Sequence, residues 1–306
     1  MPRYRSDVAT RLIRKTSTLL LLGSMIACGQ EITPEEHTRE IEEWRKARLT
    51  RLTREDGWLT LIGLEWLEEG DNTCGSGKHN KILLPAERSP EILGTFTRRA
   101  NTVDFRAHEG VEIKVNDSTI TALKLNNDDH ADGPTILRHG TLRLYVIKRG
   151  DQLGIRIKDS MSKTRTEFAG LEYFPIDVRW RVKARFTKFE TPRTMEILSL
   201  TGPPAEQAFP GVLTFTIDGK ELSLLASIEG EDLFLMFGDE TNGIETYGAG
   251  RQLYAPLPDE SGIVMVDFNK AYNWPCVFTE FATCPLPPKE NILPIRVEAG
   301  ELAQHH

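Results

Sequence analysis

From Gly57 onward the sequence alternates short apolar and polar runs with turn residues, and this pattern limits the fold more than any other feature. Such alternation, bounded by Gly, Asn, Asp and Pro, is typical of β-strands. The runs are not separated by segments of helical length, which disfavours a parallel βαβ arrangement. The predicted strands are Trp58–Ile62, Lys81–Leu84, Thr102–Arg106, Val111–Val115, Leu142–Lys148, Leu153–Ile157, Val178–Phe186, Leu213–Ile217, Glu221–Ser227, Leu233–Phe237 and Ile263–Asp267. The sequence therefore predicts a mainly β fold.

Turn residues divide these runs and suggest two β halves. Gly170 and Pro175 interrupt the pattern over residues 168–176. We therefore predict a β-sandwich-like half at 56–170 and a second antiparallel β unit, with a Cys- and Pro-rich segment, at 171–302, packed as one compact body. The predicted turns lie at Glu69–Asn72, Asn116–Ser118, Arg149–Asp151 and Asp218–Lys220.

An N-terminal helix is predicted over residues 34–55. Pro34, followed by two acidic residues, makes a favourable first helical turn. The remaining residues are dense in charge, so we expect a solvated helix that packs one face on the domain. A partner-binding helix is the alternative. The apolar stripe on this face consists of Ile41, Trp44, Leu49 and Leu52.

The first residues resemble a secretory signal. A basic stretch precedes the apolar run from Leu19, which is too short to span a bilayer as a mature helix. Small residues then lead to Cys28, which resembles the lipobox of bacterial lipoproteins. We therefore expect a signal peptide at 1–27, an acylated Cys28 (palmitate) and a linker at 28–33. The alternative is an ordinary signal peptide with a coincidental cysteine.

This lipid would be the membrane anchor of a cell-envelope protein. Gly29, rather than Asp, follows the cysteine, which resembles sorting to the outer membrane with the protein facing the periplasm. No other stretch reaches the ~18 apolar residues that a membrane-spanning helix needs.

The charge of the chain argues against nucleic acid as a partner. The full sequence carries a net charge of −7, and removing residues 1–27, with five Lys/Arg and one Asp, leaves −11. Proteins that bind nucleic acid gain much of their affinity from Lys and Arg contacts with phosphates.

Three further cysteines belong to the mature chain. Cys276 and Cys284 enclose a short loop, and in an oxidising compartment we expect them to form a disulfide that contributes about 2.5 kcal/mol. Cys74 is then expected to be a small buried hydrophobe. No pair of histidines lies near these cysteines, so the sequence does not indicate a zinc site. The mature histidines are expected at the surface or in turns: His37, His79, His108, His130 and His139.

Several motifs together resemble one protein family. They are Gly57–Leu67, Gly70–Ser76, Asn80–Pro85, Glu245–Arg251, Asp267–Asn273, Asn273–Phe278 and Ala282–Pro288. Over about residues 40–302 the chain resembles the domain of unknown function 1684 family of bacteria and archaea. Trp274 stands where a second proline is commoner. Because this family has no assigned activity, the resemblance implies no catalytic residue.

Residues 66–148 also resemble a forkhead-associated β-sandwich. The resemblance lies in Leu67–Ser76, in Asn80–Leu84 and in Leu137–Leu144. That fold reads phosphothreonine with an Arg after the Gly and a Ser-x-x-His soon after. Here Ser76 follows the glycine and no Ser-x-x-His comes next, so the resemblance implies the scaffold alone.

Two polar segments are candidates for a binding site. The glycines between residues 239 and 251 allow close backbone approach to a ligand, and Arg251 can hold a carboxylate or phosphate through two hydrogen bonds. The alternative is a buried ion pair of Arg251 with Asp239 or Glu245. The second segment follows the strand at 263–267, and its alternative role is to cap the proline-rich stretch after it. The candidate residues are Asp239, Glu245, Tyr247, Arg251, Asp267, Asn269, Tyr272 and Asn273.

These observations predict a binding or structural module with a polar pocket near Arg251 and Tyr272, which takes a small anionic or carbohydrate ligand. The alternative is an envelope hydrolase that uses the carboxylates of Asp239, Glu245 or Asp267. The sequence leaves open whether the protein is an enzyme. It contains no motif for a nucleotide cofactor, a metal or a nucleophilic serine, so we expect no cofactor.

Overall fold

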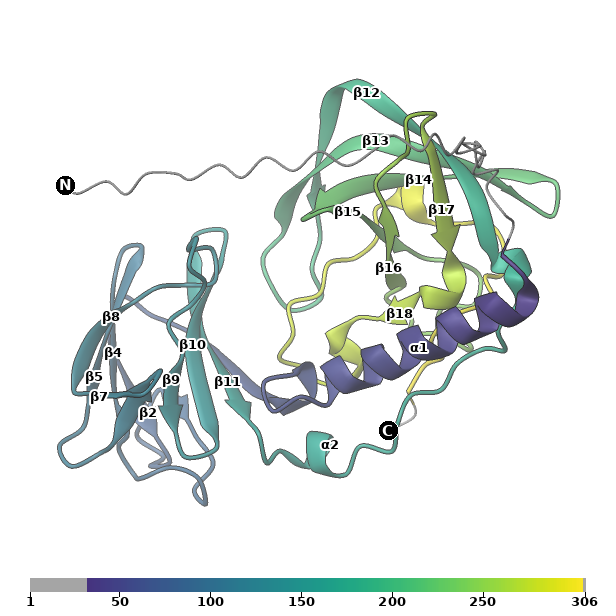
Figure 1. Ribbon diagram of the computed structural model, residues 1–306. Coiled ribbons are helices and arrows are strands. Elements are labelled where there is room, and N and C mark those ends of the chain that lie inside the picture. The colour runs from purple at the N-terminus through teal and green to yellow at the C-terminus, as the bar shows by residue number, and fades with distance from the viewer. Residues whose placement is uncertain (1–31, 305–306) are drawn as a thin grey trace, which may run out of the picture. The chain divides into compact units, whose positions relative to one another are not determined.

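The protein is described here by a computed structural model that covers residues 32–304 (Figure 1). The predicted signal peptide, Cys28 and most of the predicted linker lie outside the described residues. Within them the chain is mainly β, with one long N-terminal helix and several antiparallel sheets, as the sequence predicts. No helix between residues 32 and 304 is both long and apolar enough to cross a bilayer.

The first half of the described chain forms two sheets around one apolar core, a β-sandwich-like arrangement. One sheet has six strands in the order β1-β11-β10-β9-β6-β7 and the other has five in the order β3-β2-β4-β5-β8. All neighbours are antiparallel except β2 and β3. The strands are β1 (Leu61–Trp66), β2 (Gly70–Gly75), β3 (Ile82–Leu83), β4 (Gly94–Arg99), β5 (Thr102–Ala107), β6 (Ile113–Val115), β7 (Ser118–Ile120), β8 (Ala122–Leu125), β9 (Leu137–His139), β10 (Leu142–Arg149) and β11 (Gln152–Asp159).

Strand β11 shows how the alternation of the sequence becomes two faces. Ile155 and Ile157 point into the core together with Phe96 and Phe105. Because side chains alternate along a strand, Arg156 lies on the opposite, outer face of the sandwich.

The second half forms a seven-stranded sheet in the order β17-β12-β13-β14-β15-β16-β18, which curls around its own core (Figure 1). Phe215, Phe237 and Phe268 meet in this core, with ring centroids 5.3 Å to 5.7 Å apart around Phe268. The strands are β12 (Arg181–Ile197), β13 (Ala205–Ile217), β14 (Lys220–Glu229), β15 (Asp232–Phe237), β16 (Arg251–Pro256), β17 (Ile263–Asp267) and β18 (Tyr272–Asn273).

Short helical turns connect these strands. They are η1 (Trp58–Thr60), α2 (Lys163–Thr166), η2 (Val178–Trp180), η3 (Phe268–Lys270), η4 (Pro275–Val277) and η5 (Lys289–Asn291). The predicted hairpin turn at Arg149–Asp151 joins β10 to β11, where Arg149 pairs with Gln152. In the turn between β13 and β14, Asp218 and Gly219 both have positive φ, as a tight hairpin requires.

The structure corrects three local predictions. Residues 69–72 are not a turn, because Gly70 begins β2, which pairs with β4. The Asn72 side chain binds the backbone of Glu68 and Gly70, and this polar network stabilises a strand that contains few apolar residues. Trp58 and Val178 each begin a helical turn instead of a strand, so β1 starts only at Leu61 and β12 only at Arg181.

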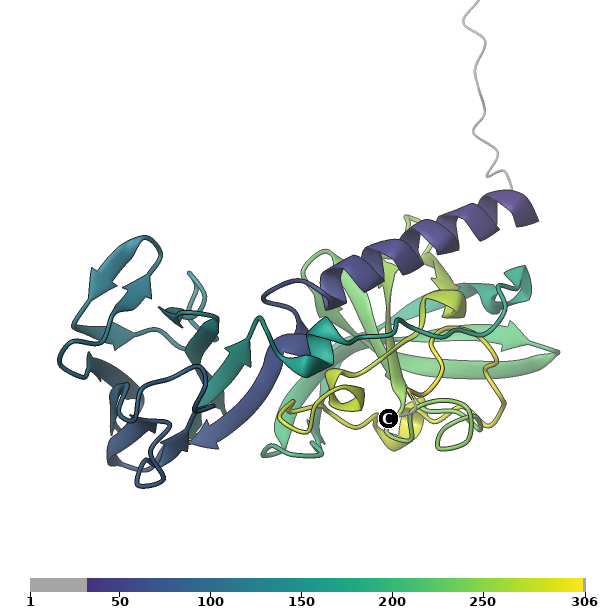
Figure 2. The ribbon, with the colours of Figure 1, turned by 90° about the horizontal axis from the view of Figure 1, so that it is seen from below.

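Helix α1 (Pro34–Leu52) runs along the half that contains β12 to β18 (Figures 1 and 2). It ends before residue 55 because Arg54 and Gly57 close a turn through a backbone hydrogen bond. Ile41 and Leu52 are buried as predicted, whereas Leu49 is exposed.

Polar residues complete the buried face of α1. His37 is buried and shares a 2.7 Å hydrogen bond with Asp267, which corrects the expectation that this histidine lies at the surface. The Arg48 guanidinium donates to Glu301 at 2.9 Å. The helix therefore docks through buried polar contacts as well as apolar ones.

Candidate ligand-binding pocket

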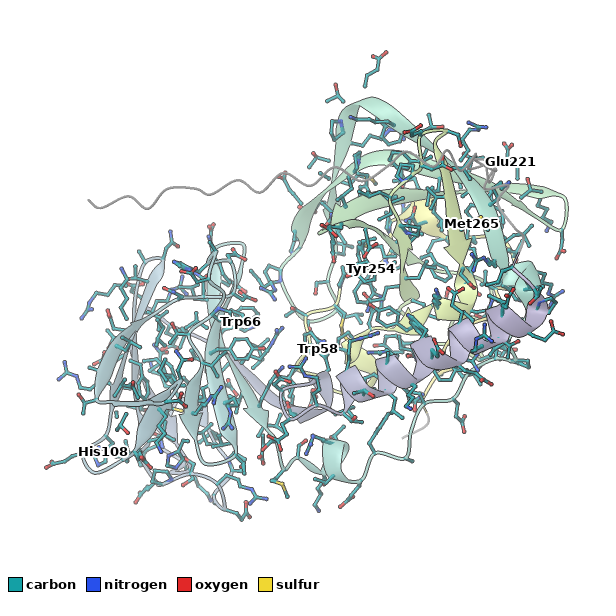
Figure 3. All side chains as sticks on the ribbon, viewed as in Figure 1. Trp58, Trp66, His108, Glu221, Tyr254 and Met265 are labelled. Atoms are coloured by element: carbon teal, nitrogen blue, oxygen red, sulfur yellow. A yellow bond between two sulfur atoms is a disulfide. The ribbon has the colours of Figure 1, made fainter. Side chains whose placement is uncertain are left out.

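A pocket of about 820 Å³ is lined by residues from both halves and from the end of α1. Its size is in the usual range for sites that bind small molecules. Trp58 and Tyr254, both labelled in Figure 3, contribute to its walls.

Cationic side chains outnumber acidic ones in this pocket. Its two acids are Asp56, which binds Arg54 through two 2.9 Å hydrogen bonds, and Glu229, which accepts a 2.6 Å hydrogen bond from Tyr254. The chain as a whole is acidic, so the positive charge here is local and favours an anion. The cations in the walls are Arg48, Arg51, Arg54, Arg149, Arg156 and Lys158.

Three of these cations are neutralised by carboxylates. Arg48 pairs with Glu301, Arg54 with Asp56, and Arg149 with Asp128. Among residues 32–304, Arg51, Arg156 and Lys158 form no ion pair with a carboxylate. Arg51 is exposed on the last turn of α1, whereas the other two lie on strand β11.

Arg156 is the least compensated cation of the pocket. Its residue is only 5% exposed. Its Nη1 donates a long 3.4 Å hydrogen bond to the Tyr145 hydroxyl, and its Nε has no partner in the described chain. The guanidinium carbon lies 5.0 Å from the centroid of the Trp58 ring, a cation–π contact. Burying a charge without a counter-ion is costly, so the Arg156 charge is poorly compensated within the described chain.

Lys158 lies two residues further along the same face of β11. Its Nζ donates a 2.5 Å hydrogen bond to the backbone oxygen of Asp56. It lies 5.5 Å from the Trp58 ring centroid and 5.8 Å from that of Tyr145. Desolvation lowers the pKa of Lys158 to about 8, and the charges of Arg156 and Arg54 act in the same direction, against the attraction of Asp56.

Aromatic rings form the other wall of the pocket. Phe234 contacts Tyr254 with centroids 5.1 Å apart, and Trp274 edge-on at 6.0 Å. Burial raises the pKa of the Tyr272 phenol to about 12, so this group is a neutral hydrogen-bonding side chain at neutral pH. Phe278 and Trp58 add further apolar surface. The pocket therefore offers rings as well as positive charge.

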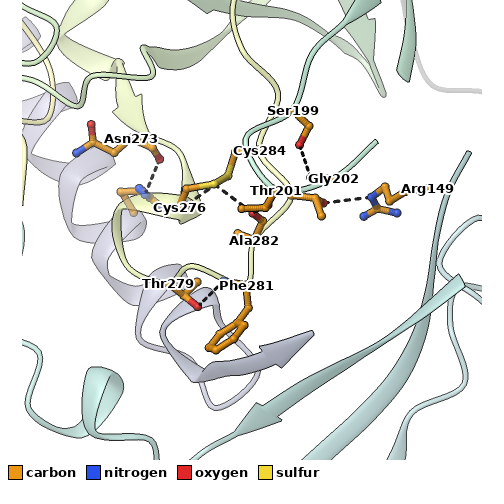
Figure 4. Close-up of a disulfide and its surroundings, with 12 residues drawn as sticks. Arg149, Ser199, Thr201, Gly202, Asn273, Cys276, Thr279, Phe281, Ala282 and Cys284 are labelled. Atoms are coloured by element: carbon orange, nitrogen blue, oxygen red, sulfur yellow. Dashed lines mark hydrogen bonds between the residues drawn. A yellow bond between two sulfur atoms is a disulfide. The ribbon is translucent and has the colours of Figure 1, made fainter. Parts of the chain in front are cut away.

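The predicted disulfide closes one end of the pocket. Cys276 and Cys284 are bonded, with Cα atoms 6.3 Å apart, and Cys284 lines the pocket. The Arg149 side chain reaches toward this segment, where its Nε donates a 3.3 Å hydrogen bond to the Thr283 hydroxyl (Figure 4). Cys74 is a free, buried thiol, as predicted, and burial raises its pKa.

Arg251 does not face this pocket, although the sequence suggested it as a ligand contact. It is 0% exposed, and its Nη2 donates to Asp239 at 2.8 Å and to the Val297 oxygen at 2.9 Å. Its Nη1 donates to the Ala299 oxygen. Arg251 therefore forms the buried ion pair with Asp239 that was the alternative prediction. Residues near the C-terminus cover its side chain.

The other candidate residues of segment 239–251 also make contacts within the fold. Asp239 accepts hydrogen bonds from the backbone and hydroxyl of Thr241, at 2.8 Å and 2.6 Å. Glu245 pairs with Arg296. Tyr247 is half-buried against apolar clusters. None of these side chains lines the pocket.

The residues of the second polar segment, 267–273, have two different roles: some stabilise the fold and others line the pocket. The Asp267 carboxylate binds His37 and accepts from the Asn269 backbone N–H at 3.0 Å, so Asp267 caps η3. The Asn269 side chain donates to the Asp177 oxygen at 2.9 Å. Tyr272 and Asn273, by contrast, line the pocket.

This arrangement removes the basis of the hydrolase hypothesis. The three carboxylates that it required are Asp239, Glu245 and Asp267, and each is held by a cation or by a buried histidine. None of them lies in the pocket wall. Glycoside hydrolysis requires two open carboxylates that face one cleft. These three residues do not provide such a pair.

Sequence reasoning missed the main pocket residues, which are Trp58, Arg149, Arg156 and Lys158. The available signal was weak: Arg156 lies at an alternate position in the predicted strand Leu153–Ile157, and Lys158 follows that strand directly. Such residues are ordinarily solvated, and only the tertiary fold shows that Arg156 is buried.

Comparisons with known proteins agree with the resemblances found in the sequence. The family model described as protein of unknown function (DUF1684) matches residues 166–302. No curated protein matches the chain. An uncharacterised protein of Haloarcula marismortui, solved by NMR, is 33% identical over 46% of this chain and 80% of its own, with a TM-score of 0.39.

Two forkhead-associated domain structures are also similar to part of the chain. One is the FHA domain of FhaA, at 16% identity over 31% of this chain and 97% of its own. The other comes from a study of phosphothreonine-dependent FHA interactions, at 16% identity over 32% of this chain and 96% of its own. Both have a TM-score of 0.22.

Proposed function

We propose that this chain, whose residues 166–302 belong to the family of proteins of unknown function DUF1684, is a binding protein. Its ligand would be a small anion that carries a ring or other apolar part. The anionic group would bind at Arg156 and Lys158. The apolar part would lie against Trp58 and the rings of the opposite wall. We call this space the Arg156 pocket.

One observation carries this proposal. Arg156 is nearly buried in the pocket wall, has no carboxylate partner in the described chain and leaves its Nε unsatisfied. A protein that needed this charge only for stability would be expected to pair it, as Arg251 is paired with Asp239. An anionic ligand would supply the missing partner and would regain the hydrogen bond.

The lining of the pocket supports the ring-bearing part of the ligand. Aromatic faces bind planar rings by stacking and by edge-on contacts. Tyr254, which is 38% exposed, offers such a face in this wall, whereas Phe234 and Trp274 are largely buried and pack against their neighbours.

A fluorescent anion with aromatic rings, 8-anilinonaphthalene-1-sulfonate, tests the proposal by titration. Arg156→Gln should weaken its binding roughly ten- to hundredfold, because a hydrogen bond to a charged group contributes about 1.5–3 kcal/mol. The matched control is Arg138→Gln, which removes an exposed arginine from β9 and should leave the affinity unchanged.

Melting curves of all three proteins should be compared first, because this dye also binds partly unfolded chains. Equal affinities of the wild type and a folded Arg156→Gln protein would contradict the proposed site.

We also propose that the mature protein is a lipoprotein of the cell envelope, attached through an acylated Cys28. The support is the sequence of the first 28 residues. The Cys276–Cys284 disulfide is compatible with an oxidising compartment such as the periplasm. Gly29 after the cysteine supports attachment at the outer membrane.

A further inference from the structure

Lys158 differs from the other basic residues of the Arg156 pocket in its chemistry. An arginine cannot become a nucleophile in a protein, whereas an amine can once it loses its proton. Among the described residues that line this pocket, Lys158 is the one lysine, and the other cations are arginines.

The surroundings of Lys158 favour the neutral amine. Its neighbours in the pocket are cations and rings, and within the described residues no carboxylate forms an ion pair with it. Its charged neighbours are Arg156 on the same strand, Arg54 and Asp56 after α1, and Arg143, which pairs with it on β10. Asp56 is already held by Arg54.

This environment brings the pKa of Lys158 to about 8. At pH 8 about half of these amines are therefore neutral, whereas an ordinary lysine is less than about 1% neutral. Desolvation next to another cation is a known way of activating a lysine amine.

We propose that Lys158 captures a small carbonyl compound bearing an anionic group as an imine in the Arg156 pocket. The inference rests on the proposed function, because Arg156 would bind the anionic group and hold the carbonyl carbon near Nζ.

The reaction needs no oxidant or reductant. The Nζ lone pair attacks the carbonyl carbon, the carbon–oxygen π bond breaks, and one proton passes from the nitrogen to the oxygen, which gives the neutral carbinolamine. The carbinolamine then loses water, and a carbon–nitrogen double bond joins the lysine to the ligand. Hydrolysis reverses both steps, so the adduct is reversible.

Pyridoxal 5′-phosphate is a suitable probe because it combines an aldehyde, an aromatic ring and a phosphate. The wild-type chain would be incubated with limiting probe at pH 8, reduced with borohydride and mapped by peptide mass spectrometry. Lys158 should be modified at least tenfold faster than any other lysine. Phenyl phosphate should slow this modification, and pyridoxal, which lacks the phosphate, should react at least tenfold more slowly.

Two variants complete the test. Lys158→Arg keeps the positive charge but removes the nucleophile, so the preferred adduct should disappear. Lys220→Arg, at an exposed position on β14, should change nothing. Melting curves verify that both variants are folded.

The outcomes separate this inference from the proposed function. Modification spread evenly over the lysines, while dye binding still depends on Arg156, would overturn the imine and leave the binding function in place. Dye binding that ignores Arg156→Gln would overturn the binding function itself. Fast, phosphate-dependent modification of Lys158 would support both.

Discussion

Two buried arginines of this chain differ in how their charge is compensated. Arg251 faces Asp239 and two backbone oxygens, so its charge is balanced inside the fold. Arg156 has a tyrosine hydroxyl at 3.4 Å and a ring face, and it lies in a pocket wall. Each leaves its Nε without a partner. Arg251 therefore stabilises the fold, whereas Arg156 is the residue that we propose for binding.

Arg251→Ala should lower the free energy of unfolding by roughly 3–5 kcal/mol, because it leaves the buried Asp239 carboxylate without its cation. Urea denaturation measures this change. Arg185→Ala, at an exposed position on β12, is the matched control and should stay within about 0.5 kcal/mol of the wild type. A loss below about 1 kcal/mol for Arg251→Ala would mean that the ion pair does not hold this region together.

At the scale of elements, the sequence predicted strands where apolar residues alternate and failed where pairing depends on the rest of the fold. Strands β10 and β11 follow the predicted runs closely. Strand β2, by contrast, reads Gly-Asp-Asn-Thr-Cys-Gly and resembles a turn, yet β4 supplies its hydrogen bonds. Local propensity cannot detect a strand whose stability comes from its neighbour.

The same limit explains the outcome for the candidate site. Residues close in sequence, such as those of segment 239–251, were expected to form a pocket, but they bind one another instead. The pocket combines strand β11 with the segment from Tyr272 to Pro285, more than a hundred residues further along the chain. Tyr272 and Asn273 of this segment were predicted as binding candidates and line the pocket, whereas strand β11 alone suggests no binding site. The disulfide was predictable, because its two cysteines are close in sequence and the compartment could be inferred.

The whole molecule is an acidic chain with a local concentration of positive charge and a proposed N-terminal anchor. The net charge, −7 for the full sequence and −11 without residues 1–27, repels most anions at a distance, so the proposed ligand would have to be recognised by close contacts in the Arg156 pocket. Acyl chains at Cys28 would hold the pocket at a membrane surface without any spanning helix.

Replacing Cys28 with Ala should release the protein from the membrane fraction and should prevent lipoprotein-type processing. Cell fractionation followed by immunoblotting measures the change, with and without an inhibitor of the lipoprotein signal peptidase. Cys74→Ala is the matched control and should remain membrane-bound. If the wild type stays soluble and its processing ignores the inhibitor, the anchor proposal is wrong.

The most direct test of the central claim follows the Nε–H signal of Arg156 by NMR while phenyl phosphate is added. The Arg156→Lys variant assigns the signal by removing it, and the Nε–H of the sealed Arg251 serves as an internal reference. We expect a saturable shift of the Arg156 signal with phenyl phosphate, no shift with the uncharged benzyl alcohol, and an unmoved Arg251 signal. An Arg156 signal that stays fixed up to millimolar phenyl phosphate would contradict the assignment of this pocket to anion binding.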